Sequence, residues 1–286
     1  MRKKTLVWLS AGLLLVLLGG AIFFGALVAA NFDFREFSTS EYEDRCYEIT
    51  EEFVSVSILA TTADIFVLPT DGTVVRVECH ELQNVTHTVS VREGVLTVEE
   101  KDMRTWSEQI GITFGSQSVT IYLPEGLWRG LSVRAATSDV AVSGLSFDTI
   151  DVTLNTGDLD MKDVTCTGTV TLQATTGDVE LENLTCAELV SNADTGDLTM
   201  EHVLVSGKMF IERSTGDVEF EGCDAAEICI QTSTGDVEGS LSRAKTFVIE
   251  TRSGEKQIPE GTSGGPCKIT TVTGDIEVEI RHNCQD

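Results

Sequence analysis

Basic and aromatic side chains are scarce in this sequence. Its 286 residues include 20 Lys and Arg against 46 Asp and Glu, which gives a formal net charge of −26, and only 6% of them are aromatic. Binding to nucleic acid or to an anionic lipid surface requires a basic footprint, so the charge argues against both functions. The shortage of aromatic rings also leaves few flat surfaces on which sugars or bases could stack.

The sequence also lacks the local motifs of common catalytic and cofactor sites. It contains no Cys-x-x-Cys pair, and its 4 His are scattered without a nucleophile motif beside them. It has no phosphate-binding glycine loop, and the glycines of its repeated tetrad stand singly at corners. We therefore predict no catalytic residue, no cofactor, no metal site and no enzymatic activity.

One long stretch near the N-terminus, residues 6–30, has no charged side chain. At about 1.5 Å per residue, a helix of this length would cross the ~30 Å hydrocarbon core of a bilayer. Basic residues precede it and mostly acidic residues follow it, so we predict a transmembrane signal-anchor helix with a cytoplasmic N-terminus, residues 1–5, and an extracytoplasmic remainder. The alternative is a signal peptide cleaved before Asn31, for which Val28 and Ala30 offer small-residue spacing.

A tetrad of the type Thr-Gly-Asp-Val recurs through the second half of the chain. Its acidic position returns every 19 or 20 residues, which is typical of a solenoid. In the seventh copy the tetrad is degenerate and reads Arg-Ser-Gly-Glu. The acidic residues of the eight copies are Asp139, Asp158, Asp178, Asp197, Asp217, Asp236, Glu255 and Asp275.

Within each repeat the apolar residues stand two apart, as Val218 and Phe220 do, or Ile228 and Ile230. This spacing predicts strands, and a unit of about 20 residues is too short for a strand with a crossover helix, which needs ~30. We predict an all-β fold, a single-chain parallel β-solenoid whose coils stack in chain order about 4.8 Å apart. Glycine suits the corner because it tolerates a positive φ.

These patterns divide the chain into five parts. After the N-terminus (1–5) and the helix (6–30), residues 31–48 are expected to form a stalk, 49–134 irregular β coils with a cap, and 135–286 the regular solenoid. Inside the fourth part, residues 101–115 are expected to form an excursion that could close the open end of the stack, because an exposed sheet edge requires cover.

Three segments together resemble a bacterial family of β-strand-repeat proteins. They are the Thr-Gly-Asp-Val strands, Ala63–Phe66 and Ser118–Glu125, and the resemblance covers about residues 45–280. The family is a domain of unknown function labelled "putative adhesin", with single-pass members in Gram-positive bacteria that are linked to envelope stress. The resemblance implies a single-pass protein of a bacterial cell membrane, and it supplies no catalytic residue.

The acidic corner residues form a predicted ladder, because successive copies should lie one coil apart. Unit charges ~5 Å apart repel by about 1 kcal/mol in water, so the ladder needs compensation. In one interpretation each Asp accepts backbone N–H groups within its own corner; in the other the ladder is a weak Ca²⁺ site. The ladder residues are Asp158, Asp178, Asp197, Asp217, Asp236 and Asp275.

The outward positions of the two strands in each repeat differ in character. Those of the first strand are acidic, which could attract a cationic partner or could simply keep the sheet soluble. On the second strand, an apolar stripe occupies one outward position on four consecutive coils, and we interpret it as a partner surface. The alternative is that this stripe is covered within the monomer. Its residues are Val190, Phe210, Cys229 and Val248.

The 8 cysteines invite disulfides in an exported domain. Cys166 and Cys186 occupy equivalent places on adjacent coils, with Cα atoms expected ~5 Å apart, so they are a possible disulfide. Cys229 and Cys267 are expected about two coils apart, which is too far to bridge. The alternative is that the cysteines are reduced core residues.

Together these patterns favour a non-enzymatic, membrane-anchored extracytoplasmic protein that acts as an adhesin or a cell-envelope interaction scaffold. The partner would be a protein or a cell-wall component. An accessory role in envelope-stress sensing is the alternative in the same class. The contrary hypothesis is a carbohydrate-active β-helix enzyme, which needs carboxylates clustered in a cleft, whereas the acids here are periodic.

Overall fold

The computed structural model describes residues 3–29, 41–105, 115–260 and 263–281. The chain separates into two compact units. One unit contains the helix α1 (Lys3–Ala29). The other contains all the described strands, β1 to β24.

Helix α1 coincides closely with the charge-free stretch predicted to be helical. Its backbone is described throughout and its side chains at residues 12, 14–25 and 28. Within the residues that are described, no helix combines the length and the apolar character needed to cross a membrane.

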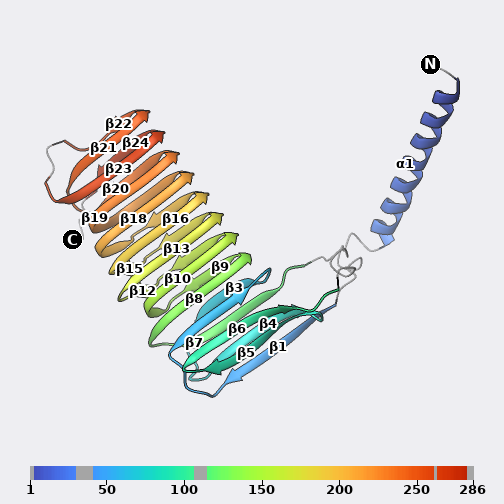
Figure 1. Cartoon of the computed structure of the whole chain (residues 1–286), viewed down its shortest axis with the longest axis horizontal. Coiled ribbons are helices and arrows are strands. Elements are labelled where there is room, and N and C mark those ends of the chain that lie inside the picture. The colour runs from blue at the N-terminus through green and yellow to red at the C-terminus, as the bar shows by residue number, and fades with distance from the viewer. Residues whose placement is uncertain (1–2, 30–40, 106–114, 261–262, 282–286) are drawn as a thin grey trace. The chain divides into compact units, whose positions relative to one another are not determined.

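The strands of the second unit form one 24-stranded sheet that winds on itself (Figure 1). The first nine strands are β1 (Tyr42–Ile49), β2 (Ser55–Ala60), β3 (Asp64–Thr70), β4 (Val75–Leu82), β5 (Val85–Arg92), β6 (Val95–Asp102), β7 (Ser118–Pro124), β8 (Leu127–Thr137) and β9 (Val140–Ser143). The next nine are β10 (Ser146–Thr156), β11 (Leu159–Lys162), β12 (Thr165–Cys166), β13 (Thr169–Thr176), β14 (Val179–Glu182), β15 (Thr185–Cys186), β16 (Glu188–Thr195), β17 (Leu198–Glu201) and β18 (Leu204–Thr215). The last six are β19 (Val218–Thr234), β20 (Val237–Leu241), β21 (Lys245–Ser253), β22 (Lys256–Gln257), β23 (Gly265–Thr273) and β24 (Ile276–Ile280).

Each regular coil contributes one strand to each of two main faces and a third, very short strand between them, as β12 and β15 do. The short-strand face runs, in spatial order, through β7, β3, β9, β11, β14, β17, the start of β19, β20, β24 and β22. The long-strand face runs through β6, β2, β8, β10, β13, β16, β18, the end of β19, β23 and β21. All of these neighbours are parallel, as a solenoid requires.

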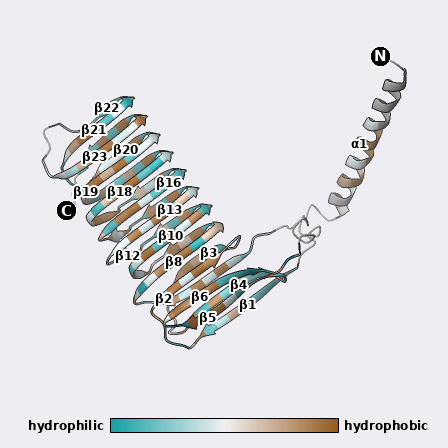
Figure 2. Ribbon diagram, viewed as in Figure 1, coloured by the Kyte–Doolittle hydropathy of each residue, from teal (hydrophilic) through white to brown (hydrophobic). Residues whose placement is uncertain are grey.

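The core lies between the two faces and consists of columns of like residues. Figure 2 shows brown apolar positions alternating with teal polar ones along the strands. In one column, seven aliphatic side chains on neighbouring coils are all buried: Val140, Leu159, Val179, Leu198, Val218, Val237 and Ile276. Burying one such side chain contributes about 1.5–3 kcal/mol, so every coil stabilises its neighbours.

The corner glycines fit because the coils approach one another too closely for any side chain. Gly196 has φ 131°, and a Cβ placed on it would lie 2.0 Å from the carbonyl oxygen of Gly177 on the neighbouring coil. No real Cβ tolerates such a contact. The sequence repeat therefore reflects backbone spacing at the corner as well as turn conformation.

At the N-terminal end the sheet is mixed, so the prediction of a purely parallel solenoid is wrong there. Four strand pairs are antiparallel: β1–β4, β4–β5, β4–β7 and β5–β6. One cause is a two-residue hairpin between β5 and β6, where Glu93 and Gly94 both have positive φ (50° and 76°), as a type I′ turn demands. Strand β1 falls almost entirely within the segment expected to be a stalk.

The coils do not stack in chain order at either end, which corrects a second expectation. Strands β2 and β3 lie between β6–β7 and β8–β9. At the other end, β23 and β24 lie between β19–β20 and β21–β22, so the seventh repeat becomes the outer edge. That repeat has the exposed Lys256 and Gln257 where inner coils have a regular short strand, and polar residues are typical of protected edges.

Parts of some predicted segments lie outside the described residues. These are residues 106–114 of the expected capping excursion, residues 31–40 of the stalk, the last residue of the predicted helix (30) and the C-terminal tail (282–286).

Candidate functional site

The Asp ladder exists, but its hydrogen bonds run between coils rather than within one corner. Asp197 N–H donates to Asp178 Oδ1 at 2.8 Å, and Asp217 N–H donates to Asp197 Oδ1 at 2.8 Å. The same bond joins the other coils in succession. One oxygen of each carboxylate is thus held by the next backbone, which offsets the repulsion between the charges.

The ladder is longer than the sequence repeat indicated. It begins at Asp64, whose Oδ1 accepts from Asp139 N–H, and ends where Glu255 N–H donates to Asp275 Oδ1. Burial raises the pKa of the Asp64 carboxyl, the hydrogen bond from Asp139 lowers it, and the charge of Asp139 raises it. Since a cation would compete with backbone N–H groups for these oxygens, the geometry explains the ladder as a structural device, and Ca²⁺ binding stays a prediction.

Three of the four residues of the apolar stripe lie side by side on the outward surface of the long-strand face. Val190 on β16 pairs with Phe210 on β18, which pairs with Cys229 on β19, and all three are half-buried. Lys268 of β23 comes next, so Val248, which is 50% exposed, is separated from the others by one coil. The stripe is therefore real but interrupted, because the seventh and eighth repeats exchange places.

The apolar stripe has a charged and polar rim. Lys208 Nζ lies 5.8 Å from the centroid of the Phe210 ring and 3.1 Å from Glu227 Oε1. Gln231 Nε2 lies 3.5 Å from Cys229 Sγ. An apolar centre surrounded by polar groups is the usual composition of a protein–protein contact.

The short-strand face is acidic, as predicted, and contains a shallow groove. Glu219, Glu238 and Glu277 occupy one register on neighbouring coils, and all three are exposed. Partial burial raises the pKa of Glu238, and the neighbouring charges, including Glu277 and Glu219, raise it further. Arg281 at one end of the groove pairs with a second row of glutamates.

The cysteines are free thiols wherever they are described. Cys166 and Cys186 lie on the neighbouring strands β12 and β15, yet the predicted bridge is absent. Instead, Cys166 Sγ–H donates to Asp148 O. Burial raises the pKa of Cys186 to about 12. Cys229 and Cys267 are on adjacent coils, not two coils apart as expected, with Cys267 buried and Cys229 half-buried.

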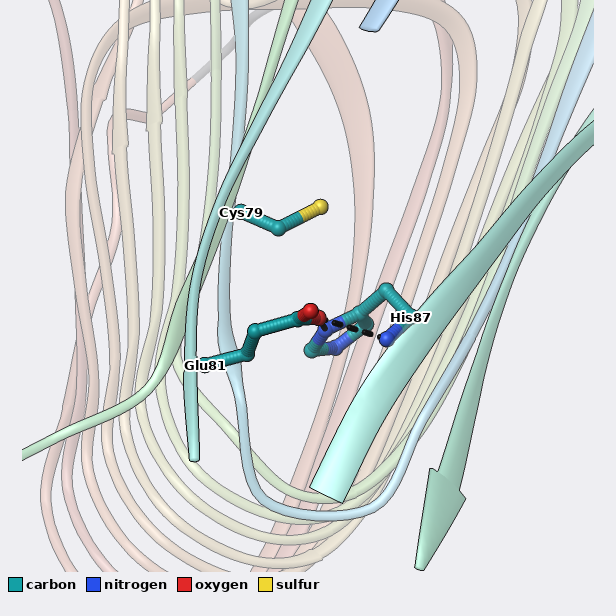
Figure 3. Close-up of side chains that lie close together, drawn as sticks. All are labelled: Cys79, Glu81 and His87. Atoms are coloured by element: carbon teal, nitrogen blue, oxygen red, sulfur yellow. Dashed lines mark hydrogen bonds and ion pairs between the residues drawn. The ribbon is translucent and has the colours of Figure 1, made fainter. Parts of the chain in front are cut away.

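A buried cluster of Cys79, Glu81 and His87 was missed by sequence reasoning (Figure 3). Glu81 Oε2 accepts from the backbone N–H of His87 at 2.6 Å and lies 2.9 Å from His87 Nδ1, while Arg45 Nε lies 3.1 Å from Glu81 Oε1. Burial, followed by the charge of Glu81, raises the pKa of Cys79 to about 12. The alternation of Cys79 and Glu81 along one strand was the available clue.

A second polar group inside the core was also missed. Arg213 occupies an inward position of β18 and is 1% exposed. Its Nη2 donates to Ser191 Oγ at 2.9 Å and its Nη1 to Glu212 O at 3.2 Å. Burial lowers the pKa of Arg213 to about 10, and Asp197 partly offsets this change. The bond to Ser191 joins two neighbouring coils, β16 and β18, whereas the bond to Glu212 stays within β18.

Comparison with known proteins supports the fold. The model of the Toastrack DUF4097 family matches residues 54–190 and 185–285. A putative adhesin from Bacteroides fragilis shares 16% identity over 84% of this chain and 97% of its own, with a TM-score of 0.55. No curated protein matches the chain significantly.

Two structures from Parabacteroides distasonis are less similar in their coordinates. A putative adhesin shares 14% identity over 85% of this chain and 98% of its own, with a TM-score of 0.42. A putative lipid binding protein shares 13% identity over 85% and 98%, with a TM-score of 0.45. At such identities a likeness concerns the fold and not the ligand.

Proposed function

Because the chain belongs to the Toastrack DUF4097 family, we propose that it is a non-enzymatic, adhesin-like protein of the cell envelope that binds a partner through its long-strand face. The observation that carries the proposal is the row formed by Val190, Phe210 and Cys229, three part-exposed apolar residues in register on adjacent coils. Exposed apolar rows with polar rims mark interaction surfaces.

The proposal includes a place outside the cytoplasm. It rests on the sequence: basic residues precede the charge-free stretch 6–30, and acidic residues follow it. In this arrangement the N-terminal helix anchors the protein in the membrane as a single-pass segment, and the strand unit meets partners on the outer side. A partner would be a protein or a cell-wall component.

A photo-crosslinking amino acid at position 210 of the full-length chain, expressed in native membranes, tests the partner surface. We expect a specific adduct at 210 and none at position 132, which is the matched control because Ser132 has the same outward register on this face but lies three coils from Val190. A wall-polymer adduct would favour adhesion, and a sensor-kinase adduct would favour the stress-sensing role. The same result at both positions, or none at either, would count against the proposal.

Loss of the Phe210 ring should weaken capture of the partner. We expect Phe210→Asp to reduce the retained partner about tenfold or more, because central aromatic residues dominate interface energies, whereas Ser132→Asp should have little effect. Circular dichroism of both variants would show that the strands persist. Equal retention by the Phe210 variant and the unmodified chain would exclude this face.

The carbohydrate-active alternative finds less support. Glu219, Glu238 and Glu277 lie close together in the acidic groove, but all three are exposed, whereas a catalytic acid is usually held in a desolvated environment that raises its pKa well above normal. The groove therefore suits a cationic ligand better than glycoside hydrolysis.

A further inference from the structure

The buried cluster at the N-terminal end of the stack draws its residues from both faces. Cys79 and Glu81 alternate along β4, so their side chains share one side of the strand. His87 is on β5, which meets β4 only at the Leu82–Val85 turn. Strand β4 then pairs with β1 and β7, and β5 pairs with β6. The cluster thus bridges the interior where these strands diverge.

The three side chains converge on one small space. One donor atom from each, the thiol sulfur, a carboxylate oxygen and a ring nitrogen, lies within 4.8 Å of the other two. Figure 3 shows the Glu81 carboxylate and the His87 ring facing one another, with the Cys79 sulfur in the same interior space. Ligands about 2.0–2.3 Å from a tetrahedral zinc ion are roughly 3.3–3.8 Å apart, so small side-chain movements would suffice.

Two polar atoms of this cluster are buried without a hydrogen bond, Glu81 Oε1 and His87 Nε2, and both side chains are 0% exposed. Glu81 Oε1 has the ion pair with Arg45 as partial compensation. Leaving a buried polar group without a hydrogen bond is destabilising, because the group has lost its bonds to water.

We propose that Cys79, Glu81 and His87 bind a divalent transition-metal ion of the zinc class. Thiolate, imidazole and carboxylate are the ligands that zinc takes in proteins, and three of them leave a fourth position for water. The thiolate and the carboxylate balance the two positive charges of the ion. Binding releases the thiol proton of Cys79 to solvent.

The ion would join the two faces at the end where they lose regular pairing. In the described part of the sheet, β1 and β5 are the outermost strands of the two faces at this end. Arg45 on β1, whose side chain is 41% exposed, contacts the buried Glu81 and marks the side from which an ion could enter. Metal binding should therefore stabilise the end of the stack that precedes the regular coils.

Titration of the metal-free full-length chain in detergent with Co²⁺, followed by competition with Zn²⁺, tests the site. We expect one high-affinity ion per chain, a thiolate-to-cobalt charge-transfer band, and a higher unfolding temperature with Zn²⁺. Cys79→Ser and His87→Gln should each lower the affinity by more than about 100-fold. The matched controls are Cys186→Ser, another buried thiol, and His80→Asn, the exposed histidine beside the cluster on β4.

X-ray absorption at the zinc edge of the unmodified chain avoids the risk that a buried variant fails to fold. A first shell containing one sulfur at about 2.3 Å and nitrogen or oxygen ligands at about 2.0–2.2 Å would support the site. Three results would overturn the proposal: a first shell of oxygen atoms only, no stoichiometric binding, or metal affinity that is unchanged in a folded Cys79→Ser variant. Glu81 would then be a buried, ion-paired carboxylate that binds no metal.

Discussion

At the residue scale, the corner tetrad has a different task for each position. Glycine permits the close approach of successive coils, since any Cβ at Gly196 would overlap the neighbouring carbonyl group. The aspartate caps the backbone of the next coil, as Asp197 does for Asp217. At the outer edge Glu255 has no stacked coil to cap among the described strands, and there the tetrad has lost its Asp.

Removing one ladder carboxylate should therefore destabilise the stack measurably. We expect Asp197→Ala to cost about 1 kcal/mol of unfolding free energy, because the N–H of Asp217 loses its acceptor. Asp197→Asn keeps a side-chain oxygen and removes a repelling charge, but it also removes the charge that partly offsets the burial of Arg213, so its cost should lie between zero and that of Asp197→Ala. Urea unfolding would measure both.

Glu255→Ala provides the internal control, because the Glu255 carboxylate is exposed at the outer edge. It should change stability by no more than a few tenths of a kcal/mol, as surface substitutions usually do. If Glu255→Ala cost as much as Asp197→Ala, the ladder bonds would not be the cause.

At the element scale, the unexpected feature is that the last two repeats exchange places. Strand β23 pairs with β19 on one side and β21 on the other. The seventh repeat is suited to the edge, because Lys256 and Gln257 are polar and exposed, while β24 supplies the buried Ile276 and Val278. Placing the more apolar coil inside buries more hydrophobic surface than stacking in chain order would.

Engineered cysteines distinguish the two stacking orders. Lys268→Cys would place a thiol opposite the native Cys229 on the adjacent strand, with Cα atoms about 4.8 Å apart, within the range of a disulfide. We expect mild oxidation to yield a bridged peptide that mass spectrometry identifies.

Val248→Cys is the matched variant, because Val248 would be the neighbour of Cys229 if the coils stacked in chain order. With β23 between them, the two Cα atoms are about 10 Å apart, too far for a bridge. If Cys229 formed a bridge in the Val248→Cys variant and none in the Lys268→Cys variant, the exchanged order would be refuted.

At the scale of the whole molecule, the excess of negative charge opposes the compact state. The formal net charge is −26, and rows of glutamate such as Glu219, Glu238 and Glu277 place like charges on adjacent strands. Such exposed repulsions are individually small and are screened by salt. The ladder bonds and the apolar columns must outweigh them.

The pH dependence should follow from the raised pKa of Glu238. Burial and then neighbouring charges disfavour the ionised form of Glu238 in the folded state. The protonated form therefore contributes stability below the ordinary Glu pKa. This contribution is lost as the pH rises through the folded-state pKa. We expect Glu238→Gln to raise stability at pH 7 and low salt by a few tenths of a kcal/mol.

That gain should shrink at high salt and at pH 4, where the native carboxyl is screened or protonated. Thermal unfolding at two salt concentrations and two pH values would measure it. Glu188→Gln, an exposed substitution on the long-strand face, should show no comparable gain. A gain independent of salt would point to a cause other than charge repulsion.

Much of the regular solenoid could be predicted from sequence because its information is local and periodic. The spacing of the acidic corner and the alternation around Val218 and Phe220 determine coil length, strand position and inward residues without knowledge of distant contacts. The family is confirmed by the Toastrack DUF4097 match. The outward position of Phe210 was predicted from the same parity and is confirmed.

What the sequence by itself determined was therefore the coil: its period, its two faces and its corner chemistry. Only the tertiary structure decided which coils are neighbours, because pairing at the ends depends on how much apolar surface each order buries rather than on position in the chain. The same non-local choice brought Cys79, Glu81 and His87 together from two diverging strands and separated Val248 from Phe210.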